Sequence, residues 1–222
     1  MIGGQRLRYM VRKLRAIHAF RRTFRNKRLC VVGSAPSLEQ HQWGRVIDGY
    51  DIVIRFNMAT VKGREHAVGS RTDIRFIGLT LRQKWLTYFA DVPPHDALWT
   101  FDKNARYLRS IQRAFVAIPT ELHRHALPLF QRRYPGVYVA AVPTKPPRTG
   151  LVFLLLLLLY GKPREVVLYG FSLDEREAYD ASYRAKETKS TSAEDRVQAH
   201  CDPRDEIAVL KRLSAHGMVT LG

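Results

Sequence analysis

The stretches LCVVGSAPSL at residues 29–38 and YDIVIRFN at residues 50–57 decide the fold. Each is a short apolar run that ends on small or hydrogen-bonding residues. Because strands covered on both faces of a sheet read as continuous apolar runs, this pattern predicts two buried parallel strands. Open α/β sheets bind their ligands where such strands end. The sequence therefore predicts an α/β protein with a ligand crevice beside the ends of these two runs.

The rest of the chain alternates between apolar runs of strand length and helical patterns. Further strands are expected at residues 72–78, 97–101, 137–142, 165–169 and 218–221. Helices are expected at residues 37–47, 107–115, 121–133, 151–160 and 203–213. Ser37 and Asp202 suit the N-caps of the first and last of these helices, and Pro128 should break or kink the third.

Composition bounds the class of protein. The 222 residues are 45% hydrophobic, which suits one domain with a sizeable core. Lys and Arg number 37 against 20 Asp and Glu, a formal charge of +17 that favours a nucleic acid, a phosphate-bearing substrate or an anionic membrane. Two cysteines, Cys30 and Cys201, exclude a disulfide-rich scaffold. No run reaches the roughly 18 apolar residues of a membrane helix, and no secretory signal is visible.

The charge divides the chain into a basic N-terminal segment, residues 1–28, and a single domain, residues 29–222. Apolar residues are interleaved with the Arg and Lys of the segment at partly helical spacing: Leu7, Tyr9, Met10, Leu14, Ile17, Phe20 and Phe24. This pattern predicts a basic amphipathic helix. Two interpretations stay open, a solvated helix packed on the domain edge and a contact with an anionic membrane or another polyanion.

A second informative unit follows at residues 147–171, where PRTG precedes LVFLLLLLLY and EVVLYGF. It predicts a loop, a buried helix and a buried strand. A helix that begins at Thr149 and Gly150 offers free N–H groups and a positive dipole end to an anion. We expect Asn57 and Thr149 to lie at adjacent ends of one crevice. The polar residues 173–199 predict a surface loop that orders over the substrate.

Three separated segments resemble the motifs of the sialyltransferases of glycosyltransferase family 29. VIRFN at residues 53–57, together with VKG at 61–63 and VGSRT at 68–72, resembles the large sialylmotif. The unit at residues 147–171 resembles the small sialylmotif, and His200 followed by an acidic residue resembles the very small motif. The three motifs occur in the order, and at about the spacing, of that family.

The resemblance implies a Rossmann-like fold (a GT-A-like variant), a mostly parallel sheet with helices on both faces. A CMP-sugar donor would bind over this sheet. The implied substrate-binding residues are Gly33, Ser34, Asn57, Arg148, Thr149, Gly150, Gly170 and Phe171. Ser34 stands where the family usually has an asparagine, and its hydroxyl can still donate to a phosphate. Asn57 matches the family's second asparagine and would bond to the ribose or the phosphate.

His200 matches the histidine that the family uses as general base. Imidazole suits this task because it titrates near the working pH. Glu206 is the expected carboxylate of the very small motif by residue type, but it lies six positions after His200. Asp205 occupies the family's fifth position, so both carboxylates stay candidates.

The family's His-Tyr motif has no counterpart here. Tyr183 is taken as the third catalytic candidate, with Tyr179 and Asp180 as the other substitutes nearby. CMP leaves readily once hydroxyls, a helix dipole or a basic residue meet its phosphate charge. We therefore expect no metal ion and no cofactor. Cys30 matches a cysteine of the large motif, but the small motif lacks the partner with which it pairs in the family.

The expected function is inverting transfer of sialic acid, or a related acidic sugar, from a CMP donor to a lipid- or protein-linked glycan. A donor carrying another nonulosonic acid or Kdo is the alternative. A basic nucleic-acid-binding protein ranks lower because the densest positive charge, residues 5–28, lies away from the motifs. No nucleic acid is expected as partner. We expect a bacterial-type, cytoplasmic protein with peripheral contact to an anionic membrane surface.

Overall fold

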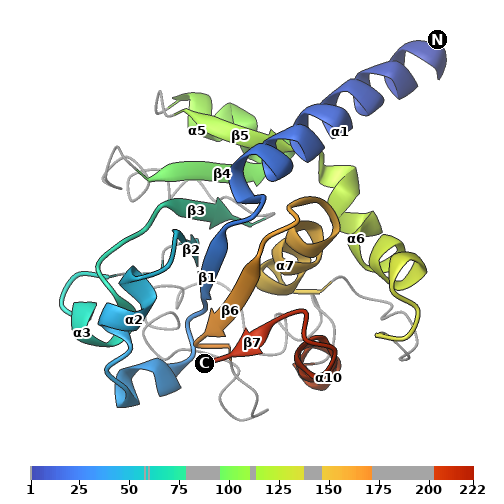
Figure 1. The fold of residues 1–222 in the computed structure, drawn as a ribbon. Coiled ribbons are helices and arrows are strands. Elements are labelled where there is room, and N and C mark those ends of the chain that lie inside the picture. The colour runs from blue at the N-terminus through green and yellow to red at the C-terminus, as the bar shows by residue number, and fades with distance from the viewer. Residues whose placement is uncertain are drawn as a thin grey trace.

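The computed structural model of the protein describes residues 2–57, 59, 61–78, 96–110, 114–137, 147–171 and 203–222. Its described strands form one sheet: β1 Arg28–Val32, β2 Ile52–Phe56, β3 Ile74–Ile77, β4 Ala97–Phe101, β5 Phe115–Ile118, β6 Glu165–Tyr169 and β7 Thr220–Leu221. Their order is β5-β4-β3-β2-β1-β6-β7, and every neighbouring pair is parallel (Figure 1). The predicted Rossmann-like α/β class is confirmed.

The direction in which the sheet grows reverses at β1. From β1 the chain adds β2 to β5 on one side, and then returns to place β6 and β7 on the other. Leu29 of β1 is in register with both Ile52 of β2 and Val166 of β6. The carboxyl ends of β1 and β6 therefore flank a topological switch point, where open α/β sheets form their ligand crevices.

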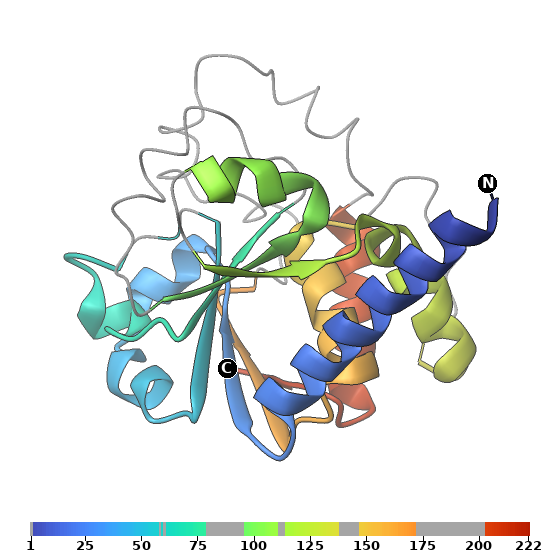
Figure 2. The same ribbon diagram turned by 90° about the horizontal axis from the view of Figure 1, so that it is seen from above.

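Helices cover both faces of this sheet (Figure 2). One face carries α1 Ile2–Phe24, α6 Thr120–Arg133, α7 Thr149–Tyr160 and α10 Pro203–Ala215, and the other carries η1 Pro36–Gln40, α2 Gly44–Asp48 and α3 Glu65–Val68. The turn η3 Asp102–Asn104 and α5 Ala105–Ser110 follow β4. Along β1, Leu29 and Val31 join the first core, while Cys30 and Val32 join the second. This alternation follows from the two-residue period of a strand.

The helix α7 lies within the larger core. Residues 151–157 are all buried, as expected for a helix that is apolar all round. The ring of Phe153 lies 4.6 Å from that of Phe76 on β3 and 6.0 Å from that of Phe20 on α1. Burying each such ring contributes about 1.5–3 kcal/mol. The predicted buried helix is confirmed, and no helix in the described ranges has the length and apolarity to cross a bilayer.

The two halves of α1 have different surroundings. Ala16, Phe20 and Phe24 in its second half are buried, and Phe20 packs 5.2 Å from the ring of Trp99 on β4. The first half projects beyond the sheet (Figure 1). The predicted N-terminal helix is therefore present, and its second half is part of the domain core.

The single helix predicted at residues 37–47 is wrong. The segment forms η1 and the separate short helix α2, and Ala35 rather than Ser37 is the N-cap of η1. Gly44 begins α2 so close to α3 that a Cβ would overlap the carbonyl oxygen of Glu65. A side chain at the first position of α2 would therefore clash with α3.

Other boundaries also differ. In place of the helix expected at residues 107–115, the structure describes α5 Ala105–Ser110 and an unpredicted strand, β5, whose residues are mostly half-exposed; residues 111–113 lie outside the described ranges. The four residues of β5 are all apolar, but the helix expected at 107–115 overlapped the start of this short run. The expected break at Pro128 is absent, since α6 continues through it as one helix. The strand expected at 137–142 falls, beyond Val137, outside the described residues.

Candidate active site

Asn57 and Thr149 meet at Gly78, beside the carboxyl ends of β2 and β3. The side-chain Oδ1 of Asn57 accepts a hydrogen bond from the Gly78 N–H at 2.8 Å, and the Asn57 N–H donates to the Phe76 carbonyl at 2.9 Å. Thr149 begins α7 against the same glycine: an added Cβ at Gly78 would lie 2.5 Å from its Oγ1. The expected proximity of Asn57 and Thr149 is confirmed, and their roles in binding stay predictions.

Asn104 and Thr100 form a buried polar pair, and Asn104 bonds to the carbonyl of Gly78. The amide of Asn104 donates to the Gly78 carbonyl and, at 3.0 Å, to the hydroxyl of Thr100. That hydroxyl in turn donates to the Ile77 carbonyl at 3.1 Å. Both residues are buried, and sequence reasoning missed them because their partners come from β3 and its end. For Thr100, a polar residue in the apolar run 97–101 was the available signal.

Gly150 and Phe171 lie together at the start of α7. A Cβ added at Gly150 would lie 3.5 Å from the Phe171 ring and 3.8 Å from the Phe56 ring. The rings of Phe56 and Phe171 are themselves 6.3 Å apart at a near-perpendicular angle. Phe171, which follows β6, thus closes one side of the α7 N-terminus and leaves no room for a large side chain at position 150.

Gly33 and Gly170 face each other across the switch point. A Cβ at Gly33 would overlap the carbonyl oxygen of Gly170, and a Cβ at Gly170 would overlap the Leu38 side chain. Gly170 also has a φ of +67°, which favours glycine. Ala35 donates to the Gly170 carbonyl at 3.0 Å, while the adjacent Ser34 is exposed at this edge. Close backbone packing therefore explains the two glycines, and the role of Ser34 in binding stays a prediction.

Arg148 and Glu206 tie the start of α10 to the start of α7. The N–H of Arg148, the N-cap residue of α7, donates to Oε1 of Glu206 at 2.5 Å. The Arg148 guanidinium donates to Oε2 at 3.3 Å. Glu206 is buried, whereas Asp205, its neighbour in the first turn of α10, is partly exposed. Glu206 thereby fixes the segment that presents Thr149 and Gly150.

The remaining catalytic candidates fall outside the described residues. His200 and Tyr183 both do so, as do Tyr179, Asp180, Cys201 and the expected loop at 173–199. Their places relative to Asn57 and Thr149 stay predictions. Cys30, by contrast, is a buried free thiol on β1, and burial raises its pKa to about 12. A thiol that stays protonated is chemically inert.

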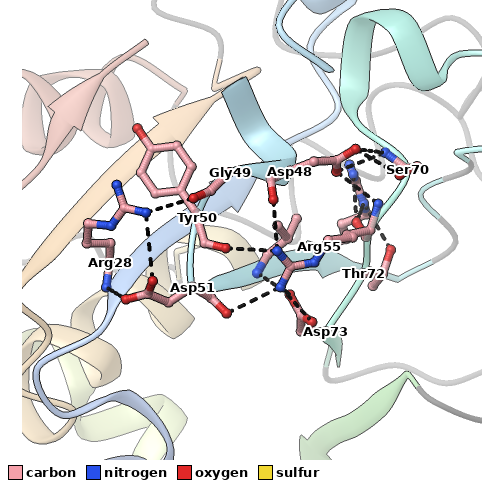
Figure 3. Close-up of polar contacts among 11 residues, drawn as sticks. Arg28, Asp48, Gly49, Tyr50, Asp51, Arg55, Ser70, Thr72 and Asp73 are labelled. Atoms are coloured by element: carbon pink, nitrogen blue, oxygen red, sulfur yellow. Dashed lines mark hydrogen bonds and ion pairs between the residues drawn. The ribbon is translucent and has the colours of Figure 1, made fainter. Parts of the chain in front are cut away.

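Arg55 is a buried cation that sequence reasoning did not single out. It lies in the middle of the VIRFN stretch, on β2, and is only 1% exposed. Its guanidinium donates to the carbonyls of Val68 at 2.6 Å, Gly69 at 3.2 Å and Arg71 at 3.0 Å. It also donates to the hydroxyl of Thr72 at 3.0 Å (Figure 3). Burial lowers its pKa to about 10. Arg55 therefore shapes the VGSRT segment rather than contacting a ligand.

Asp48 anchors the same segment from α2. Its carboxylate accepts hydrogen bonds from the Ser70 N–H at 2.8 Å, the Ser70 hydroxyl at 2.8 Å and the Arg71 N–H at 3.0 Å (Figure 3). Burial alone would raise the pKa of Asp48, but these bonds outweigh it and hold the pKa below its ordinary value. The Arg71 side chain pairs with Asp73 at 2.8 Å. Residues 68–72 of the large motif are thus a braced loop.

Two hollows lie away from this edge of the sheet. One of about 720 Å³ runs along α1, where Leu7, Val11 and Arg15 help to line it. Another of about 370 Å³ lies at the start of β6, beside Pro163 and Gly217. Neither includes Asn57 or Thr149. Across the described ranges no three His, Cys, Asp or Glu side chains gather where they could hold a metal ion.

The parallel sheet and its switch point define a Rossmann-like α/β protein, with polar residues gathered at the carboxyl edge of the sheet. The family model described as glycosyltransferase family 29 (sialyltransferase) matches residues 9–134, more than half of the chain. The chain therefore belongs to glycosyltransferase family 29, as its motifs indicated.

Similar proteins of known name share short segments with the chain. It is 44% identical over 57 residues to the CMP-N-acetylneuraminate-beta-galactosamide-alpha-2,3-sialyltransferase 1 of Gallus gallus. The aligned segment covers 26% of this chain and 17% of that protein. It is 49% identical over 49 residues to the CMP-N-acetylneuraminate-beta-1,4-galactoside alpha-2,3-sialyltransferase of Mus musculus, 22% of this chain and 13% of that protein. The matches thus span less than a fifth of these relatives.

The fold is shared with a mammalian sialyltransferase over nearly the whole chain. A crystal structure of that enzyme in complex with Gal-beta-1-3GalNAc-ortho-nitrophenol superposes with a TM-score of 0.60 at 16% identity. The superposition covers 95% of this chain and 78% of that one. At this identity the likeness concerns the fold, and it supports the arrangement of sheet and helices described above.

Proposed function

We propose that the protein transfers sialic acid, with inversion, from CMP-sialic acid to a hydroxyl of a glycan. The observation that carries this proposal is the meeting of Asn57 and Thr149 at Gly78, in a chain of family 29. The first residue comes from the large motif and the second from the small motif. Their convergence at the carboxyl edge of the sheet creates one place where both motifs reach the same nucleotide.

Asn57 and the first residues of α7 bind different groups of CMP. Because Oδ1 of Asn57 accepts from Gly78, the side-chain amide N–H groups are its donors toward the ribose or phosphate. The Thr149 hydroxyl and the first N–H groups of α7 meet the phosphate charge, aided by the helix dipole. Glu206 supports this arrangement by fixing Arg148 one residue earlier.

His200 is the proposed general base. The acceptor hydroxyl oxygen forms a bond to the anomeric carbon of the donor while the carbon–oxygen bond to CMP breaks on the opposite face. The hydroxyl proton passes to the neutral imidazole, and the electron pair leaves with the CMP phosphate. Tyr183 is the proposed hydroxyl donor to that phosphate. Stabilising the phosphate as its charge develops is the contribution that lowers the barrier.

A nucleotide panel tests the donor class. The melting temperature of the full chain is measured with CMP, CDP, UDP and AMP, because a ligand that binds the folded state raises it. We expect stabilisation by CMP above that by the other three, and its loss in Asn57→Ala. Equal shifts with all four nucleotides, or an unchanged CMP shift in Asn57→Ala, would contradict the proposal. Turnover assays with CMP-linked sialic acid and Kdo then identify the transferred sugar.

A further inference from the structure

The projecting half of α1 carries an exposed apolar stripe. Leu7, Met10, Val11 and Leu14 are 63%, 57%, 40% and 63% exposed. Their spacing of three, four and seven residues places them on one face of the helix. The core-facing residue Ala16 lies on a different face. The stripe is therefore left uncovered while the helix itself is held in place by its second half.

Positive charge flanks the stripe on both sides. Arg6 and Lys13 each precede a leucine of the stripe by one position, and Arg8 and Arg15 each follow one. One position is about 100° around a helix, so the two pairs line opposite borders of the stripe. The sequence of α1 contains seven Lys or Arg residues and no Asp or Glu. Its exposed face is thus apolar along the centre and cationic along both edges.

Arg12 fixes how this face is turned. Its guanidinium pairs with Asp102 at 2.6 Å and with Glu121 at 3.4 Å, both from the body of the domain. These contacts lie on the side of α1 that faces η3 and α6. Together with the burial of Phe20 and Phe24, they hold the stripe outward on a rigid helix. A partner surface could therefore bind the stripe without a rearrangement of the domain.

We propose that the stripe of α1 docks on an anionic lipid surface. Leu7, Met10, Val11 and Leu14 enter the boundary between headgroups and acyl chains, and the flanking cations contact lipid phosphates. The charge favours an anionic surface, and the apolar centre favours lipid over nucleic acid. Nucleic acids are bound through basic side chains with polar or aromatic contacts to bases, whereas aliphatic side chains gain more by insertion. This inference stands independently of the transferase reaction.

Vesicle co-sedimentation of the full chain tests the proposal. We expect at least tenfold stronger partition to vesicles of phosphatidylcholine with phosphatidylglycerol than to phosphatidylcholine alone. The difference should shrink in 0.5 M salt because exposed charges are then screened within about 4 Å. Equal partition to both vesicle types, or none to either, would overturn the proposal.

Two double variants separate the apolar and cationic contributions. Leu7→Gln with Leu14→Gln should weaken partition at least tenfold, because each inserted methylene contributes about fourfold. Arg8→Gln with Arg15→Gln should weaken it at least tenfold at low salt, since each cation contributes about fivefold. These substitutions keep good helix formers, and thermal melts confirm that the variants fold.

Matched controls use exposed residues elsewhere. Val46→Gln removes an exposed apolar side chain on α2, and Arg132→Gln with Arg133→Gln removes two exposed cations on α6. Both should change partition less than twofold. The proposal fails if the controls weaken partition as much as the stripe variants do. It also fails if the leucine variant binds vesicles as strongly as the wild type does. Two further measurements then identify the other occupant of the stripe. Competition by double-stranded DNA for the protein would indicate nucleic acid, and a dimer seen by light scattering would indicate a second copy of the chain.

Discussion

The N–H of Arg148 donates to the carboxylate of Glu206 across 58 positions of sequence, and this bond joins the first turns of α7 and α10. It connects the small motif, to which Arg148 belongs, with Glu206, the expected carboxylate of the very small motif. A helix N-terminus that presents groups to a phosphate must not shift, so a buried carboxylate behind it is a positioning device. The first prediction concerns this pair.

Glu206→Ala should lower the free energy of unfolding by about 2–4 kcal/mol, because it removes a buried carboxylate that accepts from both the main-chain N–H and the guanidinium of Arg148. It should also reduce the CMP-induced melting shift. Asp205→Ala is the matched control, on the same turn but partly exposed. Its cost should stay within about 0.5 kcal/mol. Denaturant unfolding measures the free energy of unfolding of both variants. An equal loss of stability in the two would contradict the positioning role of Glu206.

Gly78→Ala should weaken CMP binding more than it weakens the fold. The new methyl group would crowd the Thr149 hydroxyl and lie 3.4 Å from Oδ1 of Asn57. Both Oγ1 and Cγ2 of Thr149 lie close to the added methyl group, so the stability cost should be about 1–3 kcal/mol. Calorimetric titration with CMP measures the binding loss. Gly136→Ala is the control, since a Cβ there has no neighbour within 4 Å, and unchanged CMP affinity in Gly78→Ala would refute the shared site.

Arg55→Lys should destabilise the protein by about 3 kcal/mol although the charge is kept. The planar guanidinium of Arg55 donates to four acceptors in the 68–72 loop. The ammonium of lysine is smaller and has fewer donors, so it cannot reach all four. Arg132→Lys on the exposed end of α6 is the control and should be neutral. Urea unfolding distinguishes the two, and a neutral Arg55→Lys would show that the loop is braced by other contacts.

Asp48→Asn should lower stability near pH 7 but not in acid. The folded-state pKa of Asp48 lies below its unfolded value, so its charge contributes stability above about pH 4 that is lost as the pH falls through the lowered pKa. We expect a difference from wild type of about 1 kcal/mol at pH 7, modest because the carboxylate is partly exposed. Unfolding at a series of pH values should show this difference closing in acid. A constant difference down to pH 3 would exclude the charge as its cause.

His200→Ala should lower turnover by about 10²–10⁴, the usual share of general base catalysis, and leave CMP affinity nearly unchanged. Wild-type turnover should fall on acidification as the imidazole becomes protonated, and the variant should lose this acid limb. Cys201→Ala, one residue away, is the control and should retain activity. A His200→Ala variant with near-normal turnover and an unchanged acid limb would move the search for the base to Asp180, Asp205 and Glu206.

Local periodicity was enough to predict the parallel strands and the buried helix α7. The runs at residues 29–32 and 166–169 are apolar because both of their faces are covered, and this shows in the sequence. The helix expected at 37–47 was wrong because the apolar spacing did not reveal that the segment divides into η1 and α2, with Gly44 packed closely against α3. The edge strand β5 was missed for another reason: its four residues are all apolar, but the helix expected at 107–115 overlapped its start.

The sequence by itself determined the class of the fold, the order of the three motifs and the family to which the chain belongs. Only the tertiary structure decided what Gly78, Arg55 and Glu206 do. Their partners are backbone groups and side chains brought together by the path of distant loops, such as the Val68 carbonyl for Arg55 and the Arg148 N–H for Glu206. Hydrophobic spacing reports which side chains leave water, because burial repeats with the period of the helix or strand. It carries no record of which donor faces which acceptor, because hydrogen-bond geometry is set after the elements have packed.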